Sequence, residues 1–83
     1  MNGLKYIINI SGVKQRELAK ELGVSEANLS LLSGSLQTIP NKHLPKLAEI
    51  FKVQKHYFRK ELTPQDKVDL TIEYFRNNYG IGA

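Results

Sequence analysis

The sequence contains no cysteine and no tryptophan among its 83 residues. Without cysteine, disulfide bonds and thiolate metal sites are excluded as sources of stability for a chain of this size. No apolar run approaches the roughly 20 residues that a membrane-spanning helix needs. The N-terminus also lacks a basic region followed by an uninterrupted apolar core, so we expect no signal peptide. These absences favour a cytoplasmic protein that does not bind a membrane.

Residue patterns typical of catalysis are absent as well. There is no glycine-rich phosphate loop and no serine, histidine and aspartate context of the kind that hydrolases use. The only two histidines, His43 and His56, have no cysteine or clustered acidic residue at ligand spacing. We therefore expect no enzyme activity, no metal site and no cofactor.

The length and net charge of the chain indicate its expected stability and the kind of partner it suits. A domain of this size buries about 60–65% of its unfolded surface, and its stability is expected to be on the order of 5 kcal/mol. Dimerisation would bury further apolar surface. The formal net charge is +4 and the isoelectric point is near 9.5, values that suit a polyanionic partner but do not require one.

Residues 15–32 predict two short helices joined by a tight turn. Leu18 and Leu22 share one helical face, and Ala19 is small where two helices must cross closely. Gly23 follows directly, at a position where the chain reverses with a positive φ. Ser25 is suited to cap the next helix, whose buried face is formed by leucines three residues apart. Two helices joined in this way form a helix-turn-helix, whose second helix enters a DNA major groove.

The remaining residues also favour an all-α fold. Apolar spacing predicts a first helix that begins near Leu4 and ends near Ser11; a strand over residues 6–10 is the alternative, because these residues include several isoleucines. Further helices are expected over about 41–51, with Asn41 as its cap, over about 55–61, and from Thr63 to about Asn78. The last begins with a Thr-Pro-Gln-Asp segment, in which threonine caps and aspartate favours the helix N-terminus.

Four blocks of the sequence resemble the lambda-repressor-like (XRE or Cro-type) helix-turn-helix family: residues 12–19, 22–25, 29–30 and 44–53. The resemblance implies a bundle of five helices over residues 1–62, with residues 63–83 as a sixth helix that packs on the same domain or dimerises. It also implies a sequence-specific transcriptional regulator, a repressor of phage or mobile-element type, that binds double-stranded DNA at a palindromic operator. A second regulatory protein is a further possible partner.

Alignment to the family motif assigns DNA contacts to two sets of residues. Base contacts are expected from the start and outer face of the third helix: Glu26, Ala27, Asn28, Ser30 and Leu31. Phosphate contacts are expected from its flanks: Lys14, Gln15, Arg16, Ser25, Thr38, Asn41, Lys42 and Lys46. Alternatives remain for three of them, because Gln15 could be an ordinary first-turn residue, Glu26 a capping partner and Leu31 a core residue.

The last predicted helix carries an apolar stripe whose members are three or four residues apart: Val68, Ile72, Phe75 and Tyr79. Leu70 and Tyr74 lie on either side of this stripe. It either closes the core of the monomer or forms a homodimer interface, to which Tyr74 would also contribute. The two readings are compatible, with Val68 inward and a tyrosine crossing to the partner.

A second function is also consistent with the sequence. Related proteins commonly place glutamine, arginine or lysine on the base-reading face, whereas the third helix here has no basic residue and carries Glu26. The alternative is therefore a protein-interaction module on the same fold, similar to an antitoxin or an anti-repressor, with little base reading.

Overall fold

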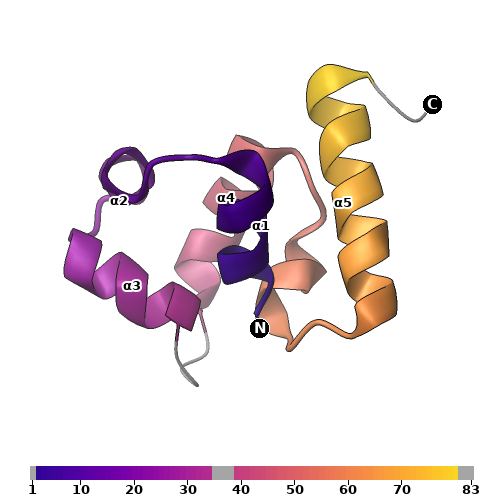
Figure 1. Ribbon diagram of the computed structural model, residues 1–83. Coiled ribbons are helices and arrows are strands. Elements are labelled where there is room, and N and C mark those ends of the chain that lie inside the picture. Colours follow the sequence, from indigo (N-terminus) through magenta and orange to yellow (C-terminus); the bar gives the residue numbers. More distant parts are fainter. Residues whose placement is uncertain (1, 35–38, 81–83) are drawn as a thin grey trace.

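The computed structural model describes residues 2–34 and 39–80, which form five α-helices and two 3₁₀ turns (Figure 1). In chain order the elements are α1 (Gly3–Ser11), α2 (Gln15–Leu22), α3 (Glu26–Gly34), η1 (Asn41–His43), α4 (Leu44–Phe51), η2 (Lys55–Arg59) and α5 (Pro64–Tyr79). No strand occurs in these ranges, although Asn2 and Glu61 form one isolated bridge. The all-α prediction is confirmed, and residues 6–10 are helical.

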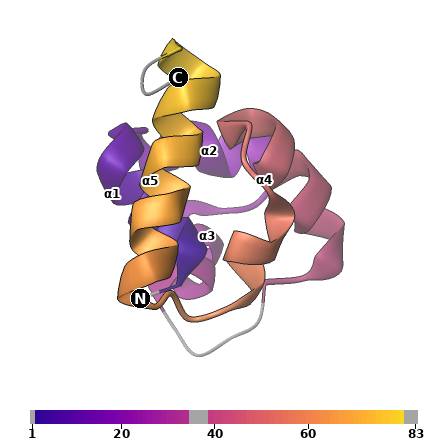
Figure 2. The same ribbon diagram turned by 90° about the vertical axis from the view of Figure 1, so that its right-hand side faces the viewer.

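The core lies where α1, α3, α4 and η2 meet. In Figure 1, α1 lies between α3 and α5, which occupy opposite sides of the bundle, and it contacts both; Figure 2 views the molecule from the α5 side. The largest side chains that are fully buried come from every α-helix and from η2: Leu4, Ile7, Leu18, Leu29, Leu44, Leu47, Phe58 and Leu70. The helix-turn-helix segment and the last helix are therefore both attached to one continuous apolar core.

The helix predicted over residues 55–61 is instead the 3₁₀ turn η2, so the prediction of six helices was wrong by one. Two adjacent aromatic residues, Tyr57 and Phe58, are both buried there, in contact with α1 and α4. The element has only five residues before the chain extends, and helical pieces this short are commonly of the 3₁₀ type. The chain then becomes extended at Lys60 and bridges to Asn2, which ends the turn.

Asn41 does not cap the fourth helix as predicted. It begins η1, and α4 starts three residues later with Pro45 in its first turn and no side-chain cap. The side chain of Asn41 instead accepts a hydrogen bond at Oδ1 from Nη2 of Arg59, 3.1 Å away. The long-range contact with η2 thus uses the oxygen that local sequence reasoning had assigned to the helix N-terminus.

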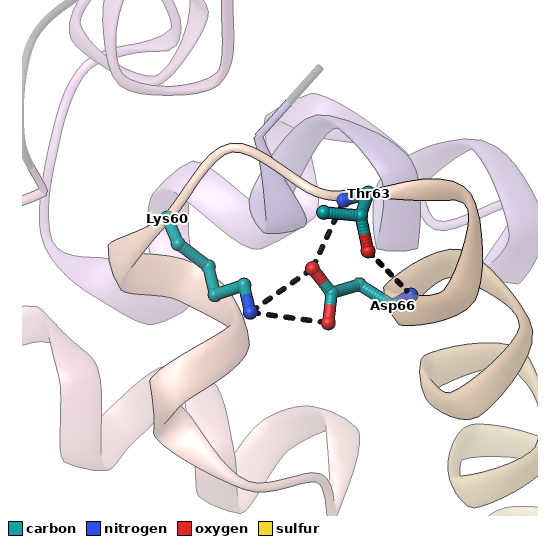
Figure 3. A network of polar contacts seen from close by, with 3 residues as sticks. All are labelled: Lys60, Thr63 and Asp66. Atoms are coloured by element: carbon teal, nitrogen blue, oxygen red, sulfur yellow. Dashed lines mark hydrogen bonds and ion pairs between the residues drawn. The ribbon is translucent and has the colours of Figure 1, made fainter.

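The start of α5 has the predicted capping chemistry (Figure 3). Thr63 Oγ1 accepts from the backbone N–H of Asp66 at 3.1 Å, and Asp66 Oδ2 accepts from the backbone N–H of Thr63 at 2.9 Å. Lys60 Nζ lies 3.1 Å from Asp66 Oδ1 and 3.0 Å from Oδ2. The Thr63 N–H and the lysine ammonium together lower the pKa of Asp66 below its ordinary value.

One face of α5 docks on the bundle through Leu70 and Tyr74, both buried. The Tyr74 ring lies 6.4 Å from that of Phe51 in α4. Burial raises the pKa of the Tyr74 phenol, and its neighbour Tyr79 raises it further. Tyr74 is therefore part of the core of its own chain, because its face of α5 is the one that meets α4.

Polar side chains of α5 complete this contact. Asn78 Nδ2 donates to the carbonyl oxygen of Phe51 at 2.8 Å, and Asn77 Nδ2 donates to that of Lys52 at 2.7 Å. These carbonyls belong to the C-terminal end of α4, where intrahelical donors run out. Glu73 accepts from the backbone N–H of Gln54 at 2.6 Å. The last helix thus satisfies backbone groups that would otherwise lack a partner in the protein.

Candidate nucleic-acid interface

The turn between α2 and α3 is built as the sequence predicted. Gly23 has φ 73°, and its N–H bonds the carbonyl of Lys20 at 3.2 Å. The next N–H, from Val24, bonds the carbonyl of Ala19 at 3.0 Å. Ser25 Oγ then accepts from the backbone N–H of Asn28 at 3.0 Å, which caps the start of α3. These bonds fix the direction in which α3 leaves α2.

The core and one polar side chain hold α3 in place. Leu29 is fully buried and Leu32 nearly so, while α3 packs against both α1 and α2. At the other end of the helix, Asn2 Nδ2 donates to the Leu32 carbonyl at 2.9 Å, and Asn2 Oδ1 accepts from the Lys5 N–H at 2.8 Å. One side chain therefore caps α1 and binds the last turn of α3. Sequence reasoning missed Asn2, because its second partner is 30 residues away.

The five residues predicted to read bases are all exposed on α3. Leu31 was assigned either to the base-contacting face or to the core. Because 51% of its surface is accessible, the core assignment is excluded. The other four are also exposed: Glu26, Ala27, Asn28 and Ser30. The side chain of Asn28 makes no hydrogen bond to another described residue, although its backbone N–H is used by the Ser25 cap. Its amide group is therefore available to an external partner.

The predicted phosphate contacts are exposed on or next to α2, which packs against α3, and on η1 and α4. They are Lys14, Gln15, Arg16 and Ser25 around α2, and Asn41, Lys42 and Lys46 at η1 and the start of α4. Thr38 lies outside the described residues. Lys14 takes the N-cap position of α2 without making a side-chain cap, so no side chain of the cap residue competes for the first-turn N–H groups. The helix start therefore presents N–H groups and the cations Lys14 and Arg16 to an anion, together with the first-turn carboxylate of Glu17.

No protein-family model, curated protein or solved structure matched the chain. The likeness to the lambda-repressor-like family therefore rests on the residue blocks and spacing described above.

Arg59 is a further cation near this surface that sequence reasoning missed. Its guanidinium donates to Asn41 Oδ1, and it is exposed at the end of η2. The contact connects η2 with η1, so Arg59 lies beside residues predicted to bind phosphate. The sequence pattern does not pair Arg59 with Asn41, because they are 18 positions apart and belong to different elements.

The other predicted interface, on α5, is largely exposed. The accessible fractions are 52% for Val68, 44% for Ile72 and 59% for Tyr79, and Phe75 is partly buried. The reading in which this stripe closes the monomer core is wrong for Val68, Ile72 and Tyr79, whereas Phe75 packs partly against the core. Tyr74, which was assigned to the dimer interface, is instead buried in its own chain. The physical reason is that α5 uses its opposite face, with Leu70 and Tyr74, against the bundle.

Three further observations concern metal binding, membrane insertion and a surface groove. In the described ranges no group of three or more histidine, cysteine, aspartate or glutamate side chains is placed to hold a metal ion. None of the helices described here is long and apolar enough to cross a bilayer. An open groove of about 690 Å³ lies beside α2, where Glu17, Lys20 and Glu21 surround apolar atoms of Val13, Leu18 and Ile50.

Proposed function

We propose that this protein is a sequence-specific DNA-binding transcriptional regulator, a cytoplasmic repressor of phage or mobile-element type without catalytic activity or a cofactor. The observation that carries the proposal is the exposed outer face of α3. It is held by a capped turn and a buried leucine pair, and the cations lie on neighbouring elements. On a palindromic operator the protein would act as a homodimer, with one α3 in each half-site.

Anchoring would come from the two flanks of α3. On one side, Gln15 and the first-turn N–H groups of α2 meet a phosphate, with Lys14 and Arg16 beside them. On the other side, Lys42 and Lys46 supply positive charge. Because α3 itself has no basic residue, phosphate neutralisation must come from these flanks, and affinity should fall steeply with salt.

Base reading would come from the exposed side chains of α3. The free amide of Asn28 can form a bidentate pair of hydrogen bonds with adenine, and Glu26 can accept from the amino group of cytosine. Ala27 and Leu31 are apolar and exposed, which suits contact with thymine methyl groups. A good bidentate contact discriminates against the wrong base by about 1–3 kcal/mol.

The test is a selection of DNA sequences by the purified protein, followed by binding measurements at several salt concentrations. Gln15→Ala should weaken binding to all sequences alike, whereas Asn28→Ala should relax preference at one base pair in each half-site. Lys67→Ala, on α5 at the far side of the bundle, is the matched control and should leave binding unchanged. No selected sequence, or a preference that Asn28→Ala leaves intact, would refute base reading by α3.

A protein-interaction module is the second candidate, and two observations favour it. The outer face of α3 has no cation and carries Glu26, and the groove beside α2 has an apolar floor bordered by two carboxylates and one lysine. Such a groove suits an amphipathic segment of a protein partner, which this chain would bind as an antitoxin-like or anti-repressor-like module. DNA binding that is absent even at low salt would favour this candidate over the first.

A further inference from the structure

The stripe on α5 consists of Val68, Ile72, Phe75 and Tyr79, of which Phe75 packs partly against the core and the other three are exposed. In a helix of 3.6 residues per turn these positions fall within a narrow sector, and Leu70 and Tyr74 fall on the opposite side. The helix is 16 residues long and lies at one edge of the molecule, with no described element beyond it (Figure 1). Contiguous exposed apolar side chains of this kind typically mark an interaction surface.

The spacing of the stripe is that of a coiled-coil seam. Its members alternate steps of four and three residues, so that they occupy successive d and a positions of heptads. Two exposed charges flank the seam, Asp69 toward the start of α5 and Arg76 toward its end. They are one heptad apart and therefore lie on the same side of the seam. This side consequently has a negative end and a positive end.

We infer that α5 pairs with α5 of a second copy of this chain in antiparallel orientation. A two-fold axis perpendicular to the helix preserves the side of the seam and exchanges its ends. When Ile72 of one copy faces Phe75 of the other, Asp69 of each copy lies opposite Arg76 of its partner. The two positions are then offset by about 3 Å along the helix axis, a distance that an arginine side chain spans. In a parallel pair, Asp69 would lie level with Asp69 of the other copy, and Arg76 level with Arg76. No ion pair would then form across the seam.

The sizes of the apolar side chains give the same orientation independently. With Ile72 of one copy facing Phe75 of the other, Val68 faces Tyr79. Each layer then combines a smaller side chain with a larger one, which fills an interface evenly. In a parallel pair, Tyr79 would face Tyr79 and Val68 would face Val68. Charge and volume therefore select the same arrangement.

This pairing specifies the dimer of the proposed function but does not depend on DNA binding. α5 and α3 lie on opposite sides of the bundle, so the interface leaves the outer face of α3 free (Figures 1 and 2). The seam is short compared with the roughly 800 Å² per partner of a standard interface, so we expect a dissociation constant on the order of micromolar. All measurements below are made without DNA, so failure of either proposal leaves the other testable.

The first experiment exchanges charges and measures association by sedimentation equilibrium. Asp69→Arg makes the two flanking positions alike in charge and should weaken the dimer by about tenfold. Adding Arg76→Asp to that variant restores opposite charges and should return the dissociation constant to near the wild-type value. Glu49→Arg, an exposed carboxylate of α4, makes the same charge change elsewhere and should have little effect. Circular dichroism checks that each variant is folded.

The second experiment measures orientation directly. Because the chain has no cysteine, single cysteines can be introduced without competing thiols. When Val68→Cys and Tyr79→Cys proteins are mixed and oxidised, an antiparallel pair gives mainly the mixed disulfide, which mass spectrometry identifies. Disulfides between like chains would instead indicate a parallel pair and overturn the inference. A protein that stays monomeric at a concentration about 100 times the expected dissociation constant would also overturn the inference. The stripe would then be a surface for another macromolecule.

Discussion

Replacement of Gly3 by alanine should destabilise the protein although it introduces the better helix former. A Cβ atom at this position would overlap the carbonyl oxygen of Tyr57 and lie 2.6 Å from its carbonyl carbon and 3.3 Å from the nitrogen of Phe58. All three are backbone atoms of η2, which cannot rotate away as a side chain would. The start of α1 must therefore retreat by at least about 1.5 Å to reach ordinary van der Waals contact.

The magnitude follows from two opposing effects. Overpacking of a closely packed contact costs about 1–3 kcal/mol, and alanine recovers at most about 1 kcal/mol through helix propensity. The shift also strains the bond from Asn2 to the Leu32 carbonyl, which adds up to about 1 kcal/mol. We expect a net loss of about 2 kcal/mol, which corresponds to a fall in Tm of roughly 8–16 °C for a domain of this size.

Urea unfolding followed by circular dichroism measures this loss. Gly34→Ala is the matched control, because a Cβ atom there meets nothing within 4 Å and Gly34 has no positive φ. That variant should be unchanged or more stable by up to about 1 kcal/mol. The packing argument is refuted if Gly3→Ala unfolds at the wild-type urea concentration, or if both alanine variants lose equal stability.

Three further predictions concern caps. Thr63→Ala removes the acceptor for the Asp66 N–H and should cost about 1 kcal/mol in urea unfolding, whereas an unchanged midpoint would show that the box contributes nothing. The lowered pKa of Asp66 means that its carboxylate stabilises the fold above its ordinary 3.8 and that this stability is lost as pH falls through the folded-state value. Asp66→Asn should therefore flatten the loss of stability on acidification, measured as urea midpoints near pH 7 and near pH 2; equal slopes in both proteins would contradict this. Asn2→Ala should cost about 1–2 kcal/mol and increase hydrogen exchange in the last turn of α3, and unchanged exchange there would show that Asn2 does not hold that helix.

Local hydrogen bonds explain which elements could be predicted. The turn at Gly23, the Ser25 cap and the Thr63 capping box all depend on backbone and side-chain groups within about four residues, so the residue types indicate them directly. The exposed face of α3 was predicted for the same reason, since helical spacing separates its leucines from its polar residues. Leu31 was left open, because spacing alone does not say how wide the buried face is.

Local sequence patterns did not predict which face of α5 is buried. Both faces of this helix are apolar, and the longer stripe is the one that faces solvent. The buried face is flanked by polar side chains that form hydrogen bonds to the bundle. Asn78 donates to the Phe51 carbonyl, and the hydroxyl groups of Thr71 and Tyr6 are hydrogen-bonded at 2.7 Å. Those partners are 27 and 65 residues away along the chain, so no window of sequence presents them together.

The amino-acid sequence by itself determined the helical class, the helix-turn-helix segment and most helix boundaries, because turns and caps are chosen by residues that are neighbours in the chain. Only the tertiary structure decided that residues 55–59 form a 3₁₀ turn, that Asn41 bonds Arg59, and that α5 leaves an apolar stripe exposed. In each case the deciding free energy comes from burial or hydrogen bonding between distant segments, which exists only after the chain has folded.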